Sequence, residues 1–541
     1  MKYKLHLISC LAVGLATFQC AAQAPAANSD AAANIRMLLQ NGSAEISNYN
    51  TACYLALSGD KELAFTYLKE AVISDRFDNL KNIENDTDLK SLHADPRWAE
   101  MINAVKENAS KGGKISGAFF NQDKFWNGNA LKTAYKPALS EEERIAGLSK
   151  FWSEAKYNFV NFDLIPNLNF DSLYLAYLPK VKESKSTLDY YKVMSSFCAQ
   201  LRDGHTNVYA PDELLSEVYS RPLLRSRLVE DKVIIVDVFD PELTKKGIKR
   251  GQEIVSIDGQ PVKTYAAEKV APYASASTPQ DLEVRAFEYQ LLSGSLSEAV
   301  VLKLKDASGK TATHQVKRID PPHLPYTMAS APFEYKLLKG NVAYITLNSF
   351  GTDSAARAFA KNFPEIAKAD AIIFDVRNNG GGNSSVGWNI LSFLVNKTTP
   401  INAWYTRDYK PSYRAWGRIQ EVSGGSNTLR PAGQLYYSKP VVVLTGPKSY
   451  SAAEDFAAAF KSLKRGTIIG TATGGSSGQP LMIALPGNLS ARICTKRDQL
   501  PDGTDFVGKG VQPDLLVEQT VADFRKGIDT ELQAALKFLK K

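Results

Sequence analysis

Cysteine and histidine are scarce in this sequence, with five residues of each among 541. Only Cys53, Cys198 and Cys494 lie beyond the first twenty residues, and each falls in a different region. Three scattered cysteines do not form a disulfide framework, and no cysteine or histidine pair has the spacing of zinc ligands. The sequence therefore predicts buried, unpaired thiols, no metal site and no cofactor.

The sequence also lacks a block of basic residues and, after its first twenty residues, a long apolar run. A net charge of +8 that is spread along the chain does not make the clustered basic surface that binds nucleic acid. A membrane-spanning helix needs about 20 consecutive apolar residues. We therefore expect no nucleic-acid partner and no stable membrane span.

The first 24 residues have the pattern of a secretory signal peptide. Lys2 and Lys4 form a basic start, residues 5–18 are apolar, and Ala22-Gln23-Ala24 is a small-x-small cleavage site. This pattern predicts export to the periplasm or the cell exterior. Cys20 leaves lipid anchoring open as an alternative, although residues 17–19 match a lipoprotein signal poorly.

At 541 residues, the chain is long enough for three or four domains. Residues 30–113 carry apolar positions at helical spacing, among them Ala52, Leu55, Ala64 and Leu68. Residues 49–71 resemble one tetratricopeptide repeat, with a turn at Gly59-Asp60. One repeat is too short for a solenoid, so the pattern predicts a small helical unit that could dock a partner. A second helical region, residues 114–222, includes a predicted capping box of Ser140 and Glu143.

The periodicity changes after residue 222. Residues 228–239 have the pattern of a β-branched strand, and residues 247–259 resemble the core of a PDZ domain, a module that binds extended peptides as an added strand. A generic small β-domain is the alternative for residues 223–320. From residue 330 to 520, strands at 342–347, 371–376, 439–444 and 467–470 alternate with helices, which predicts an α/β core with a largely parallel sheet. Residues 521–541 are predicted to form a C-terminal helix.

A serine opens one helix of this core. Residues 439–444 form a buried strand, and an apolar helix begins at Ser451 after a short loop. A hydroxyl at this junction lies beside unpaired N–H groups at the positive end of the helix dipole, which would stabilise an oxyanion. Ser451-Ala452-Ala453-Glu454 is also a capping box, so a purely structural role is the alternative.

A strand that ends in three glycines is the second feature. Residues 371–376 lead into Gly380-Gly381-Gly382, where the absence of Cβ atoms would let a backbone N–H approach a substrate carbonyl. Asp375 and Arg377 are placed to brace this turn as a buried ion pair. A phosphate-binding loop is excluded because no Gly-Lys-Ser/Thr follows. A flexible turn is the alternative.

A lone histidine follows a predicted helix end at Asp203-Gly204. Serine becomes a nucleophile when a base with a pKa near 6.5 takes its proton, and histidine is the side chain that titrates there. His205 is therefore the candidate base, with a loop residue of no catalytic role as the alternative.

Together, residues 375–382 and 451–454 resemble the signature segments of the C-terminal processing peptidases. The resemblance covers residues 117–519 and implies a serine peptidase with a crotonase/ClpP-like core and a PDZ-like domain between helical region and core. It places the nucleophile at Ser451 and the oxyanion hole at Gly381 or Gly382 together with Ala452. It also implies protein or peptide substrates, with recognition of the substrate's C-terminal tail.

The resemblance also decides the expected base. The Ser-Lys members carry a lysine about 25 residues after the serine, whereas residues 470–480 of this chain contain none, and Lys509 lies too far along. Leu201-Arg-Asp-Gly-His-Thr206 is instead similar to the tricorn-type branch, which implies His205 as base. That branch adds an acidic residue, for which Asp505 is the tentative candidate and Asp502 the next, while a dyad without an acid is the alternative.

Two other functions remain open from the sequence. A noncatalytic carrier of hydrophobic ligands or peptides would use the same fold with Ser451 as a helix cap. A hydrolase of non-peptide esters would use the same residues as the peptidase.

Overall fold

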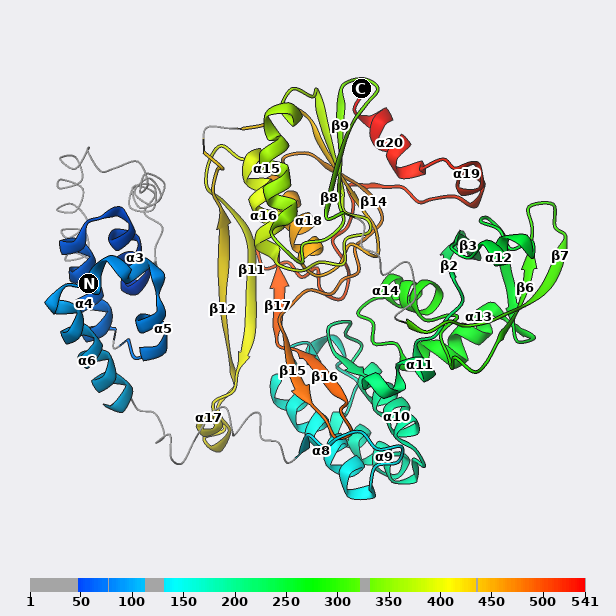
Figure 1. The fold of residues 1–541 in the computed structure, drawn as a ribbon, viewed down its shortest axis with the longest axis horizontal. Helices are drawn as coiled ribbons and strands as arrows, with labels where there is room; N and C mark the ends of the chain where they lie inside the picture. The colour runs from blue at the N-terminus through cyan, green and yellow to red at the C-terminus, as the bar shows by residue number, and fades with distance from the viewer. Residues whose placement is uncertain (1–46, 76, 112–130, 322–330, 434–435, 541) are drawn as a thin grey trace. The chain divides into compact units, whose positions relative to one another are not determined.

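The computed structural model describes residues 47–75, 77–111, 131–321, 331–433 and 436–540 (Figure 1). The contacts divide the chain into two compact units, Met1–Trp126 and Asn127–Lys541, which are described separately. The predicted signal peptide and Cys20 lie outside the described residues.

The first unit is helical. Its helices are α3 (Asn48–Ser58), α4 (Lys61–Ile73), α5 (Leu80–Asn85), the 3₁₀ helix η2 (Thr87–Leu92) and α6 (Pro96–Lys111). The expected turn is present, because Gly59 adopts a left-handed conformation (φ 86°) and Asp60 caps α4 by accepting the N–H of Leu63 at 3.1 Å. Ala52 and Leu68 are among the predicted apolar residues that the α3–α4 packing buries.

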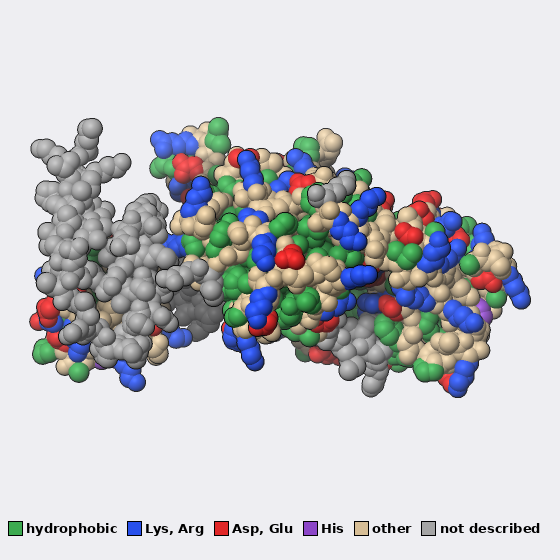
Figure 2. All heavy atoms as spheres, turned by 90° about the horizontal axis from the view of Figure 1, so that it is seen from above, with side chains coloured by type: hydrophobic (Ala, Val, Ile, Leu, Met, Phe, Trp, Pro, Cys, Tyr) green, Lys and Arg blue, Asp and Glu red, His purple; other side chains and the backbone are tan. Residues whose placement is uncertain are grey.

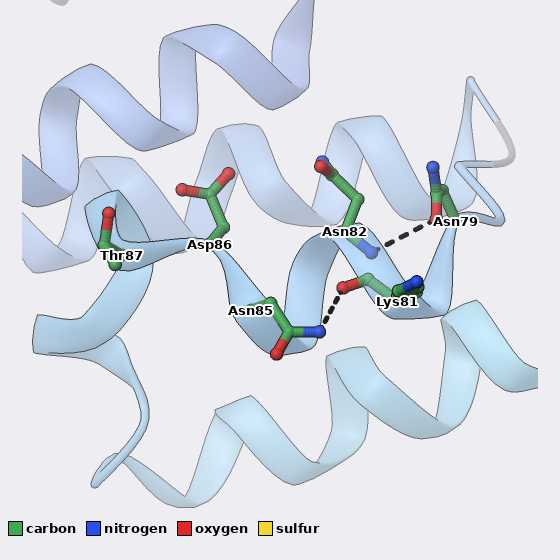
Figure 3. Close-up of a pocket in the computed structure, with 6 residues that line it drawn as sticks. All are labelled: Asn79, Lys81, Asn82, Asn85, Asp86 and Thr87. Atoms are coloured by element: carbon green, nitrogen blue, oxygen red, sulfur yellow. Dashed lines mark hydrogen bonds between the residues drawn. The ribbon is translucent and has the colours of Figure 1, made fainter. Parts of the chain in front are cut away.

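A polar hollow lies beside α5 in this unit (Figure 3). Half of its six lining residues are asparagines. Two of these amide side chains make local hydrogen bonds: Asn79 accepts the N–H of Asn82, and Asn85 donates to the carbonyl of Lys81. Asp86 accepts a hydrogen bond from Tyr49 at 2.8 Å. The hollow therefore presents amide groups rather than a nucleophile and its base.

The second unit is built around a six-stranded sheet in the order β18-β14-β13-β10-β9-β8. All neighbouring pairs are parallel except β8 with β9. The strands are β8 (Phe333–Leu338), β9 (Val342–Leu347), β10 (Ala371–Asp375), β13 (Val441–Thr445), β14 (Thr467–Gly470) and β18 (Leu515–Leu516). The predicted α/β core with a largely parallel sheet is confirmed.

Helices cover both faces of this sheet. On one face lie α15 (Ser354–Ile366), α16 (Ser384–Leu391) and α18 (Ala452–Leu463), whose apolar side chains share a core with Ile345, Phe374 and Val443. On the other face, α20 (Thr530–Phe538) packs on Ile373 and Leu444. Burial on both faces explains why the central strands are continuous apolar runs without alternation.

The helical region before the core contributes α8 (Glu141–Asn158), α9 (Phe170–Glu183) and α10 (Thr187–Ala199), and the Ser140–Glu143 capping box is present. These helices share a core with an antiparallel sheet of β1 (Asn207–Tyr209), β16 (Ser490–Cys494) and β15 (Pro480–Ala484). Residues 480–494, which the sequence assigned to the α/β core, therefore pack instead with the helical region.

A separate antiparallel sheet has the order β2-β3-β4-β6-β7. Its strands are β2 (Leu224–Val229), β3 (Lys232–Val238), β4 (Glu253–Ile257), β6 (Val300–Lys305) and β7 (Thr311–Val316), with short helices α12 (Pro241–Lys245), α13 (Val262–Tyr265), α14 (Pro279–Glu283) and the π-helix η8 (Val284–Tyr289). The single strand predicted over residues 228–239 is wrong, because Glu230 and Asp231 have φ values of 45° and 67° and turn the chain between β2 and β3.

Two further elements complete the unit. β11 (Thr399–Asp408) pairs with β12 (Glu421–Leu429) and β17 (Lys496–Gln499), with α17 (Pro411–Ala415) between β11 and β12 (Figure 1). The single C-terminal helix predicted for 521–541 is also wrong: α19 (Val521–Lys526) ends at Gly527, whose φ of 73° breaks the helix before α20.

The predicted burial of the three cysteines is confirmed, since Cys53, Cys198 and Cys494 are buried free thiols. Across the described residues, no helix combines the length and apolar character that a bilayer crossing requires. On the face shown in Figure 2, acidic and basic side chains are interspersed and no basic stripe is seen.

Candidate active site

Ser451 lies at the junction between β13 and α18, in an unusual backbone conformation. Its φ of 55° and ψ of −124° are sparsely populated for a residue with a side chain and cost on the order of 1–3 kcal/mol. The preceding loop is held by Ser449, whose hydroxyl donates to the Val376 carbonyl at 2.8 Å. Such strain persists where the surroundings determine the conformation, and it leaves the Ser451 side chain half-buried at the start of the helix.

The hydroxyl of Ser451 faces the histidine from the distant helical region. Oγ of Ser451 and Nε2 of His205 are 3.0 Å apart, although the residues are separated by 246 positions. The capping arrangement with Glu454 is also present, with its Oε1 accepting the Ser451 N–H at 3.3 Å. The two interpretations of this serine therefore coexist: the residue caps α18 and also meets an imidazole.

His205 is fixed from several sides. Its side chain is 4% exposed, and its ring stacks on Tyr450 with centroids 5.2 Å apart and planes 15° apart. Its backbone N–H donates to Oδ1 of Asp203, a buried carboxylate that also accepts from Thr206 and Asn161. The imidazole is thus held in one position before any ligand binds.

The second ring nitrogen of His205 has its own partner. Nδ1 lies 2.7 Å from Oγ of Ser476. When Nδ1 carries the proton and donates to Ser476, the lone pair of Nε2 faces Ser451, which is the tautomer that a base requires. Burial and the nearby cations Arg492, Arg285 and Lys496 lower the pKa of His205 to about 3, so the ring is neutral at physiological pH.

The glycine loop approaches Ser451 as its lack of side chains allows. A Cβ at Gly381 would lie 2.7 Å from Cβ of Ser451, and one at Gly382 would lie 2.2 Å from the carbonyl carbon of Phe350. The Gly381 N–H already donates to Oδ1 of Asn379 at 2.9 Å. Gly382 forms an isolated parallel bridge with Phe350, in which the Phe350 N–H donates to the Gly381 carbonyl and the Phe350 carbonyl accepts the Asn383 N–H. The N–H groups of Gly382 and Ala452, the first residue of α18, are therefore the candidates for oxyanion donors.

The ion pair expected beneath this loop is present and larger than expected. Arg377 bonds Asp375 at 2.6 Å and also Asp529 at 2.7 Å, the residue that caps α20. Tyr344 donates to Asp375 at 2.5 Å. The ion-pair network of Arg377 therefore connects the end of β10 to the C-terminal segment. The sequence predicted the pair with Asp375 but not the one with Asp529.

Comparisons with known proteins agree with this arrangement. Residues 341–517 match Peptidase family S41. This part of the chain is similar to the C-terminal processing peptidases. The chloroplastic C-terminal processing peptidase of Tetradesmus obliquus is 26% identical over 300 residues, which is 54% of this chain and 58% of the relative. Tricorn protease of Thermoplasma volcanium is 24% identical over 257 residues, or 46% of this chain and 23% of the relative.

The fold comparison points the same way. The solved structure of mature CPAF complexed with lactacystin covers 74% of this chain and 97% of its own length, with a TM-score of 0.60 and 15% sequence identity. At this identity the likeness concerns the fold alone. The chain spans less than two thirds of the length of the Tetradesmus relative.

One departure from the resemblance to C-terminal processing peptidases concerns the acid. The expectation that Asp505 orients His205 is wrong: its Oδ1 accepts from Gln499 at 2.8 Å and its Oδ2 lies 3.5 Å from Arg497. Asp502 is exposed and accepts the N–H of Thr504. The position beside Nδ1 is occupied by Ser476, from the glycine-rich stretch 470–480 that contains no lysine.

A buried glutamate shapes that stretch. Glu454 accepts hydrogen bonds from Thr473 Oγ1 at 2.6 Å and from the N–H groups of Gly475 and Ser476 at 2.7 Å. Burial raises the pKa of Glu454 to about 8, while these donors oppose the rise. The helix that carries the serine and the loop that carries Ser476 are therefore joined through one carboxyl group. Lys509 is exposed, and the described residues contain no group of His, Cys, Asp or Glu that could hold a metal ion.

Proposed function

We propose that this C-terminal processing peptidase homologue hydrolyses peptide bonds in protein or peptide substrates, with Ser451 as nucleophile and His205 as general base. The observation that carries the proposal is the 3.0 Å distance between Ser451 Oγ and Nε2 of a neutral, buried imidazole. The proposal draws further support from the S41 match and the names of the relatives.

The proposed reaction proceeds through an acyl-enzyme. Ser451 Oγ attacks the scissile carbonyl carbon while Nε2 of His205 takes the hydroxyl proton. The oxyanion lies against the N–H groups of Gly382 and Ala452, and the macrodipole of α18 stabilises it further. The imidazolium then protonates the leaving amine. A water molecule, deprotonated by the same nitrogen, releases the acyl group and restores the serine.

Residues 223–320 are proposed to act as a PDZ-like module that receives the substrate's tail. β2 is an end strand of its sheet, as an added peptide strand requires. A cavity of about 690 Å³ lies beside β2, and its lining includes Arg227 from β2 and Lys448 from the loop before Ser451. Both cations pair with Glu288, at 3.3 and 2.5 Å, so the proposal rests on the free edge of β2 and not on a charge that would hold the terminal carboxylate. Export by a signal peptide and partner binding by the tetratricopeptide-like unit, residues 30–113, remain proposals from the sequence.

Fluorophosphonate labelling tests the proposed function. We expect an alkyl fluorophosphonate to modify the wild-type chain at Ser451 stoichiometrically, because only a serine activated by a base reacts readily. Tryptic mass spectrometry locates the adduct, and Lys509→Ala, which changes an exposed lysine, should label at the wild-type rate. A chain that binds peptide but stays unlabelled would favour the noncatalytic carrier. Labelling together with turnover of esters alone would favour the ester hydrolase.

The pH dependence of labelling follows from the histidine. Because burial lowers the pKa of His205 to about 3, Nε2 stays unprotonated far below pH 6.5. We expect the labelling rate to persist to about pH 5, whereas an exposed histidine would lose its base function near pH 6.5. The folded-state pKa lies below the unfolded value, so this histidine stabilises the fold above pH 6.5 and that stabilisation decreases as the pH falls. Thermal melting at each pH separates unfolding from protonation of the base; an acid limb at pH 6.5 in folded protein would contradict the assignment.

A further inference from the structure

We propose that Asp281, in the β-sheet unit, is the carboxylate that positions His205, acting through the hydroxyls of Tyr450 and Ser476. The inference rests on the proposed function of Ser451 and His205 and assigns the acidic member that Asp505 does not supply. Asp281 is a positioning residue, since it touches neither the nucleophile nor the base.

The first link of this relay is the contact between His205 and Ser476. Nδ1 and Oγ are 2.7 Å apart, and the Ser476 side chain is fully buried. A serine hydroxyl can accept one hydrogen bond and donate another. For Nδ1 to donate, the Ser476 proton must therefore point to a second acceptor.

Tyr450 supplies that acceptor. Its ring stacks on His205, and its hydroxyl lies next to the side chains of Ser476 and Asp281, the second of which shares with it the space beside Gly204. Nη2 of Arg285 donates to the same hydroxyl at 3.0 Å. With Arg285 as one donor and Ser476 as the second in the proposed relay, the Tyr450 proton points at Asp281. The chain of donors then runs in one direction, from Nδ1 through two hydroxyls to a carboxylate.

The carboxyl group at the end of the relay is paired with a guanidinium. Asp281 is 2% exposed and pairs with Nε of Arg285 at 2.8 Å, and its Oδ2 accepts the N–H of Ser277 at 3.0 Å. Burial raises the pKa of Asp281, but the guanidinium and these donors favour the charge. An ionised carboxylate only accepts hydrogen bonds, so it fixes the direction of the whole relay.

The same segment holds the histidine loop. Oγ of Ser277 accepts the N–H of Gly204 at 2.9 Å, and a Cβ at Gly204 would lie 1.8 Å from the Tyr450 hydroxyl. Gly204 therefore leaves room for the relay immediately before His205. The contacts place α14, which belongs to the substrate-docking unit by sequence, inside the catalytic arrangement. Because Arg285 neutralises Asp281, we expect the carboxylate to set the imidazole tautomer rather than to add net charge.

Tyr450→Phe and Asp281→Asn test the inference. We expect each to lower kcat and the labelling rate of Ser451 by about 10- to 10²-fold at unchanged KM, a part of the 10²–10⁴ that a general base contributes. The double variant should be no slower than the slower single variant, since both interrupt one relay. Glu268→Gln, an exposed carboxylate of the same unit, serves as the matched control at the wild-type rate.

A second readout is independent of turnover. With only five histidines in the chain, the ¹⁵N resonances of His205 should be assignable by comparison with His205→Gln. We expect the Nδ1–H tautomer in the wild type and a mixed population in Tyr450→Phe, which removes a hydroxyl and leaves the ring and the Asp281–Arg285 pair.

The outcomes separate the two proposals. A wild type that fluorophosphonate does not label would overturn the proposed function and this inference together. A labelled wild type whose Tyr450→Phe variant keeps both its rate and its tautomer would overturn the relay alone. If Asp281→Asn does not fold, Tyr450→Phe decides.

Discussion

Ser451→Ala is expected to lower kcat/KM for peptide hydrolysis by roughly 10⁴–10⁶-fold, because the covalent route needs the hydroxyl and only the oxyanion donors would remain. The fold should persist, since the substitution removes one oxygen and keeps the Glu454 carboxylate on the Ser451 N–H. Steady-state kinetics with a peptide substrate measure the loss. Circular dichroism melting checks that the midpoint changes by no more than a few degrees, as a change of about 1 kcal/mol would imply.

Lys509→Ala is the matched control for this variant. The lysine lies in a Gly-Lys-Gly segment that resembles the base of Ser-Lys peptidases, yet its side chain is exposed. We expect wild-type kinetics. Full activity in Ser451→Ala would remove the nucleophile assignment, and a large loss in Lys509→Ala would point to a lysine base.

The α/β core was predictable because each of its strands can be recognised from its own residues. Val441–Thr445 is buried throughout and apolar up to its last residue, and such a run is typical of a central parallel strand. The glycines after β10 and the serine at the start of α18 follow from the same logic, since strand ends and helix starts present backbone donors in any α/β sheet. Together with the family resemblance, this logic makes Ser451, Gly382 and Ala452 candidates without knowledge of long-range contacts.

Turn positions and strand partners were harder to predict from the sequence. The β2–β3 turn is formed by Glu230 and Asp231 at positive φ, without the Asn-Gly or Asp-Gly pair that usually announces a hairpin. β15 and β16 lie within the sequence span of the core and pair with each other, but β16 also pairs with β1, some 280 residues earlier. Strand pairing is settled by tertiary packing, which local patterns do not encode.

The hydrogen-bond partner of His205 Nδ1 could likewise not be predicted from local sequence patterns. The family pattern predicts Asp505 as the acid beside His205 from its position in the chain. The contact to Nδ1 comes instead from Ser476, inside a stretch whose glycines are typical of a flexible loop. The loop is ordered because Glu454 accepts two of its N–H groups. A buried glutamate one turn into a helix looks like a capping residue in the sequence, and its second role becomes visible only when distant segments meet.

His205→Gln is expected to lower kcat by roughly 10³–10⁴-fold with little change in KM, because the amide fills part of the imidazole's space but cannot take the Ser451 proton. Fluorophosphonate labelling should fall in parallel, which distinguishes loss of the base from loss of substrate binding. His93→Gln changes an exposed histidine of the N-terminal unit and should leave both rates unchanged. The double variant Ser451→Ala/His205→Gln should be no slower than Ser451→Ala, since a base has no function without its nucleophile. Additive losses in the double variant would instead mean that the two side chains act separately, and the 3.0 Å contact between them would then be structural.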